Sequence, residues 1–447
     1  MSGCNLKRRD FLLASAGVLA VTAAGCSTSA TRTETDFSWE LQPPESAGVN
    51  ASALAYVRAA VQQHIDSHAQ TGAVTAFARN NKLVWFEAQG VRDVETGEPM
   101  RRDDIFRMMS STKVVTSVAV MMMADEGKLN INDPVSRYIP SFANPRVAIP
   151  PAGWERIVAD PSARDQLVAA IQIVPAEREI TIKDLLTHTS GLSSGLGLLP
   201  GPGSSLNQSV SVETILTERT LATHVPTLGE HILDFQPGSR WGYSPLDGMD
   251  TLLHIVEIVS GQEAESFLHQ RLFTPLEMHD TYFNLPEEKQ HRLLALYERR
   301  ENEWQRGTPL LGTAPTRYIS GAGGLMSTAH DFLNFELMLL NRGVFNGRRI
   351  LRAETVDLVA TNHVGTLFAE WIPPITRGQG FGLGGRIVLD PSVLNDGRGL
   401  GSFGWGGAYG TESWFDPANN VAAVYFVQQS GAGPASDYGR AIRDALI

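Results

Sequence analysis

The spacing of apolar residues along the chain predicts strands near both ends and helices between them. In residues 50–68, apolar side chains recur at the three- and four-residue intervals of an amphipathic helix. Two β-rich runs, residues 73–79 and 82–90, are joined at Asn80-Asn81, which is the sequence pattern of a hairpin. Helical patterns dominate residues 181–343, and strand patterns return at residues 381–389, 411–415 and 421–428. The arrangement predicts one sheet built from the two ends of the chain, with a helical lobe inserted.

The composition is typical of a folded globular protein. Hydrophobic residues make up 43% of the chain, which is too many for a disordered protein. There are 37 Lys and Arg against 48 Asp and Glu, so the formal net charge is −11. This charge argues against a nucleic-acid partner, because binding to phosphates requires clustered positive side chains. The sequence contains no P-loop and no complete dinucleotide fingerprint, so we expect no cofactor.

The first thirty residues have the pattern of an export signal. Lys7, Arg8 and Arg9 precede an uncharged apolar run at residues 13–25, which is too short to span a bilayer comfortably. The paired arginines resemble a twin-arginine signal, and the sequence ending at Cys26 resembles a lipoprotein cleavage box. We therefore expect residues 1–30 to be a signal and tether, with a periplasmic or lipid-anchored mature protein. Ordinary cleavage near Ala30, without a lipid, is the alternative.

The two cysteines limit the chemistry that the chain can carry. Cys4 lies within the expected signal, and Cys26 would be the first residue of a lipidated protein. We therefore expect no disulfide framework and no thiolate metal site.

One serine and one lysine form a candidate nucleophilic pair. Residues 114–124 are apolar on every face, which predicts a buried helix that starts near Ser110 and ends at Gly127. Ser110 and Lys113 are three residues apart and would share one face of this helix. A serine hydroxyl needs a neighbour that accepts its proton, and a buried lysine can serve. The alternative is a helix-start serine with an unrelated lysine, but no other Ser-x-x-Lys occurs in the chain.

This motif and its surroundings resemble the serine β-lactamase and DD-peptidase superfamily. Ser110-Ser111-Thr112-Lys113 is followed by Asp125-Glu126-Gly127-Lys128-Leu129 and by Asp133-Pro134-Val135, as in that superfamily. Residues 180–192, 323–328 and 343–351 also fit, the first of them with Leu-Leu-Thr-His-Thr-Ser-Gly. The resemblance implies a β-lactamase/transpeptidase-like α/β (α+β) fold, with an antiparallel sheet flanked by helices. Residues 40–447 would then form a single two-lobed serine hydrolase domain, with its helical lobe at roughly residues 130–343.

The second and third motifs of the superfamily are altered in this chain. Tyr-x-Asn maps to Tyr243-Ser244-Pro245, and Lys-Thr-Gly maps to Trp405-Gly406-Gly407, for which we expect an edge strand. The resemblance implies that Tyr243 carries protons beside Ser110, that Trp405, Gly406 and Gly407 bind substrate, and that the N–H groups of Ser110 and Ala408 form the oxyanion hole. Simple packing is the alternative for both Tyr243 and Trp405.

These departures favour an ester over a β-lactam as the substrate. In the family, the missing Lys holds the carboxylate of the drug and the missing Asn binds its side-chain amide. The combination found here resembles the class C β-lactamase-like carboxylesterases, often called family VIII esterases. We therefore expect a serine hydrolase that cleaves short-chain carboxylic esters through an acyl-enzyme. The alternatives are a β-lactamase, a D-amino-acid peptidase, an acyltransferase and a non-catalytic binder of cell-wall peptides.

Three other patterns could be mistaken for sites. Residues 191–195 match the Gly-x-Ser-x-Gly elbow around Ser193, but a helical run precedes them where that elbow needs a strand. His64 and His68 are four residues apart without a third ligand, so we expect surface residues and no metal. For His188, the resemblance implies a structural hydrogen bond that fixes its loop.

Overall fold

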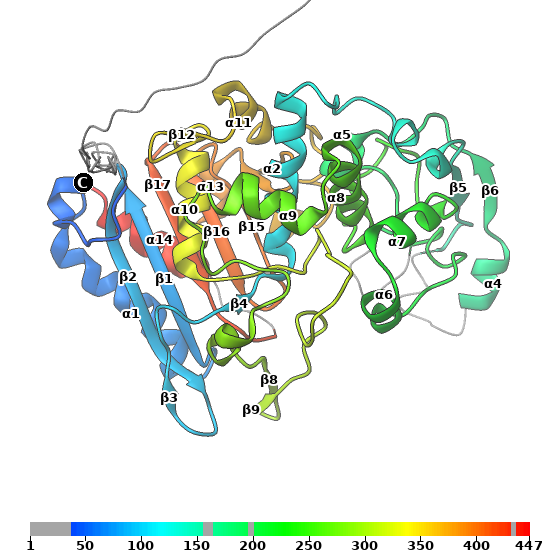
Figure 1. Cartoon of the computed structure of the whole chain (residues 1–447). Coiled ribbons are helices and arrows are strands. Elements are labelled where there is room, and N and C mark those ends of the chain that lie inside the picture. Colours follow the sequence, from blue (N-terminus) through cyan, green and yellow to red (C-terminus); the bar gives the residue numbers. More distant parts are fainter. Residues whose placement is uncertain (1–36, 155–163, 195–200, 431–434) are drawn as a thin grey trace, which may run out of the picture. The chain divides into compact units, whose positions relative to one another are not determined.

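An eight-stranded antiparallel sheet joins the two ends of the described chain (Figure 1). The computed structural model describes residues 37–154, 164–194, 201–430 and 435–447. The strand order is β13-β14-β15-β16-β17-β1-β2-β3, so β17 (Val421–Phe426) lies beside β1 (Gly72–Arg79). The register pairs Val74 with Phe426. The predicted sheet from two distant chain segments is therefore confirmed.

The predicted hairpin forms β1 and β2 (Lys82–Asp93). Its turn residues, Asn80 and Asn81, have φ angles of 53° and 59°. Two successive residues in the left-handed region define the turn whose twist matches that of paired strands, and asparagine tolerates this conformation.

Helices cover both faces of the sheet. The predicted first helix is α1 (Leu54–Asp66), which packs with α14 (Ala435–Ala445) and buries Val57 and Val61 on one face. On the other face, α10 (Ala329–Leu340) packs against β1, β16 (Thr411–Asp416) and β17. Seven successive residues of β1, 72–78, are buried. Because successive side chains of a strand point to opposite faces, both faces of β1 are covered.

Two details of the strand prediction are wrong. Residues 381–389 form two short strands, β13 (Gln379–Phe381) and β14 (Arg386–Val388), because the chain turns at Gly384, where φ is 88°. Strand β15 (Phe403–Gly406) is not an edge strand throughout, since it lies between β14 and β16. However, β14 pairs only with Phe403 and Gly404 of β15. Trp405 and Gly406 pair with β16 alone and, among the described residues, leave their other edge without a partner strand.

The inserted lobe is mostly helical and also contains a small sheet. The buried helix α2 (Thr112–Asp125) packs against its main helix, α8 (Asp247–Ser260). Helix α10 falls within residues 130–343 but covers the main sheet, so the helical lobe ends before it. The other elements of the lobe are α4 (Arg164–Ala169), α5 (Ile182–Leu186), α6 (Val212–Glu218), α7 (Leu221–Leu228), α9 (Ala264–Leu268), β5 (Arg146–Ile149), β6 (Gln172–Pro175) and β7 (Ile232–Leu233).

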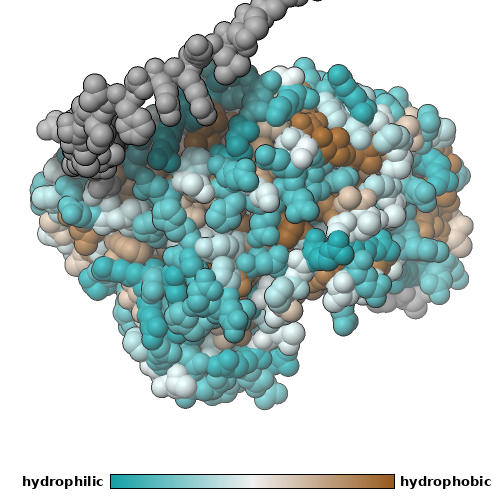
Figure 2. All heavy atoms as spheres, viewed as in Figure 1, coloured by the Kyte–Doolittle hydropathy of each residue, from teal (hydrophilic) through white to brown (hydrophobic). Residues whose placement is uncertain are grey.

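Short elements complete the connections. They include β3 (Glu98–Pro99), β4 (Phe106–Arg107), β8 (Tyr297–Arg300), β9 (Glu303–Arg306), β10 (Met326–Ser327), β11 (Val344–Phe345), β12 (Arg348–Arg349), α11 (Ala353–Val359), α12 (Pro373–Thr376) and α13 (Pro391–Leu394). Hydrophilic residues cover most of the face seen in Figure 2, and hydrophobic side chains appear there in scattered patches. None of the helices in the described part of the chain is long and apolar enough to cross a bilayer.

Candidate active site

Ser110 lies at the start of the buried helix, as the sequence predicts. It belongs to a 3₁₀ turn, Met109–Ser111, that leads directly into α2. Residues 112–123 of α2 are all buried, so the helix runs through the core, and Ser110, just before it, is partly exposed. Met109 has a φ of 46°, a conformation that non-glycine residues rarely adopt and that costs free energy. A serine at a helix start faces the positive end of the helix dipole, which favours developing negative charge.

Lys113 is fully buried, and its Nζ has three neighbours. It lies 2.7 Å from the carbonyl oxygen of Pro245, 2.8 Å from that of Ala322 and 3.2 Å from Ser110 Oγ. Among the described residues, no carboxylate lies within ion-pair distance of Nζ. A carbonyl oxygen can only accept, so the carbonyls of Pro245 and Ala322 bind two N–H groups of Nζ. The remaining tetrahedral direction of the nitrogen atom then points at Ser110 Oγ. A neutral amine would hold its lone pair there.

Tyr243 reaches the same hydroxyl from the opposite lobe. Its O–H group donates to Ser110 Oγ across 2.7 Å, and the Lys113 Nζ lies 5.1 Å from the centre of its ring. The structure therefore brings the predicted serine, lysine and tyrosine together around one oxygen atom.

His188 holds the chain that carries Tyr243, and the predicted structural hydrogen bond is present. Its Nδ1 accepts from the N–H of Ser244 across 3.2 Å, and its carbonyl oxygen accepts from the N–H of Gly242 across 2.9 Å. Its ring packs 4.8 Å from that of Tyr243. Burial, reinforced by the charge of Lys113, holds the pKa of His188 well below its usual value. The imidazole is therefore neutral and serves as an acceptor.

A buried aspartate that the sequence analysis did not single out supports Lys113. Asp250, on α8, accepts hydrogen bonds from the Tyr318 hydroxyl, the Ser320 hydroxyl and the Ala322 N–H, at 2.8, 2.9 and 3.1 Å. The carbonyl of Ala322 then holds Nζ. Burial raises the pKa of Asp250 to about 7, opposed by its hydrogen bonds and by Lys113. The sequence offers little signal for this role, because α8 also carries Asp247, His254 and Glu257, and only the burial of Asp250 shows that this carboxylate needs partners.

The altered third motif lies against the 3₁₀ turn of Ser110. A Cβ atom on Gly407 would lie 2.2 Å from the carbonyl oxygen of Met108, so only glycine allows this approach. The Thr411 hydroxyl donates to the same oxygen across 2.9 Å and lies 3.0 Å from the hydroxyl of Ser111. The turn between β15 and β16, which includes the exposed Ala408, is thereby fixed beside the predicted nucleophile.

Trp405 forms part of an aromatic wall beside Tyr243. Its ring centre lies 5.9 Å from that of Tyr243 and 5.3 Å from that of Phe381. Trp241, Phe368 and Trp371 extend the same cluster, and Trp371 comes from a segment to which the sequence analysis assigned no role. Trp405 is partly buried, so the wall combines packing with an exposed apolar surface.

The rejected patterns have structural explanations. The Ser193 hydroxyl donates to the Asp247 carboxylate across 2.5 Å, and helix α5 precedes its loop instead of a strand. Residue 195, the last of the Gly-x-Ser-x-Gly pattern, and residues 196–200 lie outside the described residues. His64 contacts Asp437 at 2.7 Å and therefore links α1 to α14. Within the described part of the chain, no group of three or more His, Cys, Asp or Glu side chains could hold a metal ion.

The fold is that of the serine hydrolases related to β-lactamases, and the comparisons with known proteins agree. Residues 57–447 match the Beta-lactamase family, and the chain belongs to that family. It is 34% identical over 381 residues to protein Rv1367c of Mycobacterium tuberculosis, covering 83% of this chain and 89% of the relative. Its homologues in the family include esterases, an acyltransferase and D-alanyl-D-alanine carboxypeptidases.

Two comparisons indicate closeness to the esterases of the family. The chain is 30% identical over 419 residues to esterase EstB of Burkholderia gladioli, covering 89% of this chain and 95% of the relative. A solved structure described as EstCE1, a hydrolase with promiscuous acyltransferase activity, superposes with a TM-score of 0.68 at 26% identity, covering 88% of this chain and 98% of the other. The predicted resemblance is confirmed at the level of family and fold.

Proposed function

We propose that the protein is a carboxylesterase that cleaves short-chain esters through an acyl-enzyme on Ser110. The observation that carries the proposal is the convergence of Lys113 Nζ and Tyr243 Oη on Ser110 Oγ, at 3.2 and 2.7 Å. A nucleophile and its base need contacts of this length. A non-catalytic peptide binder would have no need to bury a lysine beside a serine.

In the first half of the reaction, Ser110 Oγ attacks the ester carbonyl carbon. The serine proton passes to the Lys113–Tyr243 pair, and the N–H groups of Ser110 and Ala408 stabilise the negative oxygen. The bond to the alcohol oxygen then breaks, and the pair returns the proton to the departing alcohol. We assign acceptance of the proton to the pair and not to one of the two side chains, because coupled groups share their titration.

In the second half, water attacks the acyl-enzyme. The same pair removes a proton from the water, and the carboxylic acid leaves as Ser110 regains its proton. An alcohol in place of water would give acyl transfer, and the similarity to EstCE1 makes this the second candidate activity.

The substrate class rests on Trp405 and its neighbours. A neutral aromatic wall at Trp405-Gly406-Gly407 suits an uncharged ester better than an anionic lactam. Pro245 has no side-chain amide that could bind the amide of a lactam drug or a peptide. β-Lactamase and D-amino-acid peptidase activities are therefore the less favoured alternatives.

Kinetics on purified protein test this proposal. We expect hydrolysis of nitrophenyl butyrate to exceed that of nitrocefin, and Ser110→Ala to abolish ester turnover while the circular dichroism spectrum stays unchanged. Ser193→Ala is the matched control and should retain activity. Loss of turnover in Ser193→Ala alone, or a preference for nitrocefin, would overturn the assignment. Acceptor-dependent ester products would favour the acyltransferase.

We also propose that residues 1–30 direct export and that Cys26 is lipidated. These residues lie outside the described part of the chain, so the proposal rests on their sequence pattern. Mass spectrometry of the mature N-terminus from a host with twin-arginine export should find a diacylated Cys26. An unmodified N-terminus near Ala30 would contradict lipidation, and an intact signal would contradict export.

A further inference from the structure

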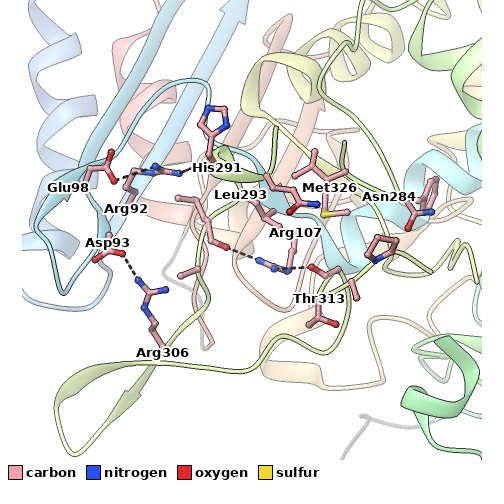
Figure 3. Close-up of a pocket in the computed structure, with 18 residues that line it drawn as sticks. Arg92, Asp93, Glu98, Arg107, Asn284, His291, Leu293, Arg306, Thr313 and Met326 are labelled. Carbon is pink, nitrogen blue, oxygen red and sulfur yellow. Dashed lines mark hydrogen bonds and ion pairs between the residues drawn. The ribbon is translucent and has the colours of Figure 1, made fainter. Parts of the chain in front are cut away.

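A cavity that is separate from the proposed catalytic residues lies between the β2–β3 hairpin and residues 283–315. It has a volume of about 510 Å³, within the range of small-molecule sites. Neither Ser110, Lys113 nor Tyr243 lines it. Figure 3 shows Arg107 at its centre, with Leu293 and Met326 on one side and Thr313 on the other. The walls thus combine apolar side chains with polar ones.

Arg107 is a buried cation without a carboxylate partner. Only 9% of the residue is exposed. Its guanidinium donates to the carbonyl oxygens of Leu294, Leu311 and Gly312 at 2.7, 3.2 and 2.9 Å. Gly312 has a φ of 71°, a backbone conformation that favours glycine. These three bonds use three of the five N–H groups, and no described carboxylate lies within ion-pair distance.

The other charged groups of the cavity are neutralised. Arg306 pairs with Asp93 at 2.5 Å and with Glu95 at 2.6 Å. Arg92 pairs with Asp104 at 3.0 Å and with Glu98 at 3.5 Å. The dashed lines of Figure 3 mark contacts of these arginines. Among the arginines that line the cavity, Arg107 is therefore the one without a carboxylate contact in the described part of the chain, and although burial lowers the pKa of its guanidinium, an arginine stays protonated at neutral pH.

We propose that this cavity binds a small monocarboxylate, with the carboxylate on Arg107 and the apolar part against Leu293 and Met326. A buried charge without a counter-ion is costly, and a single carboxylate supplies one matching charge. The planar guanidinium fork suits the two oxygens of a carboxylate. The hydroxyl of Thr313 lines the same cavity and can add a hydrogen bond, whereas the amide of Asn284 is already bonded to the backbone of Thr316.

Isothermal titration with sodium butyrate at fixed ionic strength tests the proposal. We expect saturable binding of one butyrate per chain, no binding of butyramide, and weaker binding of inorganic phosphate. Arg107→Gln should weaken butyrate binding at least tenfold, whereas Arg306→Gln, the matched control in the same cavity, should change it less than twofold.

Thr313→Trp provides a second test should Arg107→Gln fail to fold. Thr313 is exposed at the cavity, and its side chain makes none of the Arg107 bonds, so the indole should block entry and also abolish binding. Equal butyrate binding by wild type and either variant would overturn the site. Phosphate that binds as tightly as butyrate would overturn the carboxylate specificity. The test requires no esterase activity, so its failure is distinguishable from failure of the proposed function.

Discussion

The backbone carbonyl oxygen of Pro245 lies 2.7 Å from Lys113 Nζ and helps to hold the amine beside Ser110 Oγ. Proline has no side-chain amide, yet its carbonyl still orients the amine toward Ser110. The resemblance implies that Pro245 stands where the second motif of the superfamily has asparagine. An ester has no amide for such a side chain to bind, which is consistent with the proposed substrates.

Lys113→Ala is expected to lower kcat for nitrophenyl butyrate by about 10²- to 10⁴-fold, the usual contribution of a general acid or base. The two carbonyls that bind Nζ would also lose their donors, so the melting temperature should fall. Lys113→Met, which keeps the length of the side chain, controls for the cavity. Stopped-flow measurement of the acylation burst checks the result, and an unchanged burst rate in both variants would exclude Lys113 from proton transfer.

Tyr243→Phe should remove the hydrogen bond to Ser110 Oγ and keep the packing of the ring on His188. We expect kcat to fall about 100-fold with KM within about threefold, since the hydroxyl acts on the reacting proton. Steady-state kinetics on a short ester measure both constants. A rise in KM with unchanged kcat would mean that Tyr243 only binds substrate.

Asp250→Asn tests whether Asp250 is a positioning residue for Lys113. The amide is nearly isosteric, but it has one acceptor oxygen where the carboxylate has two, so it cannot accept from Tyr318, Ser320 and Ala322 together. We expect kcat to fall about tenfold with little change in KM, and Asp250→Ala to fall further. Equal activity of wild type and Asp250→Asn would separate this residue from catalysis. Tyr318→Phe, which removes one of the three donors, should have the smallest effect.

Glu336 provides a prediction about stability. Its side chain is fully buried, it accepts from the Ser413 hydroxyl across 2.6 Å, and burial raises its pKa to about 8. A carboxyl whose pKa is higher in the folded protein stabilises it most when protonated. This contribution is complete below about pH 4.5 and is lost as the pH rises toward 8. Urea unfolding at several pH values should show that Glu336→Gln flattens this decline, and an equally steep decline would contradict the prediction.

The proximity of Ser110 and Lys113 was predictable because its information is local. Ser110 and Lys113 lie three residues apart in the sequence, and Asn80-Asn81 between two β-rich runs specifies the hairpin. The residues that hold Lys113 in place were not predictable from the sequence. Pro245 and Ala322 act through backbone carbonyls and lie more than 100 residues from Lys113 in the sequence. Asp250 acts on Lys113 only through Ala322. The glycines around Gly384 broke a run that looks like one strand, and the position of β15 depends on pairing that no local pattern encodes.

Peptide mapping by mass spectrometry after brief reaction with a fluorophosphonate tests the central claim most directly. The account predicts a single adduct on Ser110, formed much more slowly in Lys113→Ala and absent from Ser110→Ala. An adduct on Ser193, or an unmodified Ser110 in protein that still hydrolyses nitrophenyl butyrate, would contradict it.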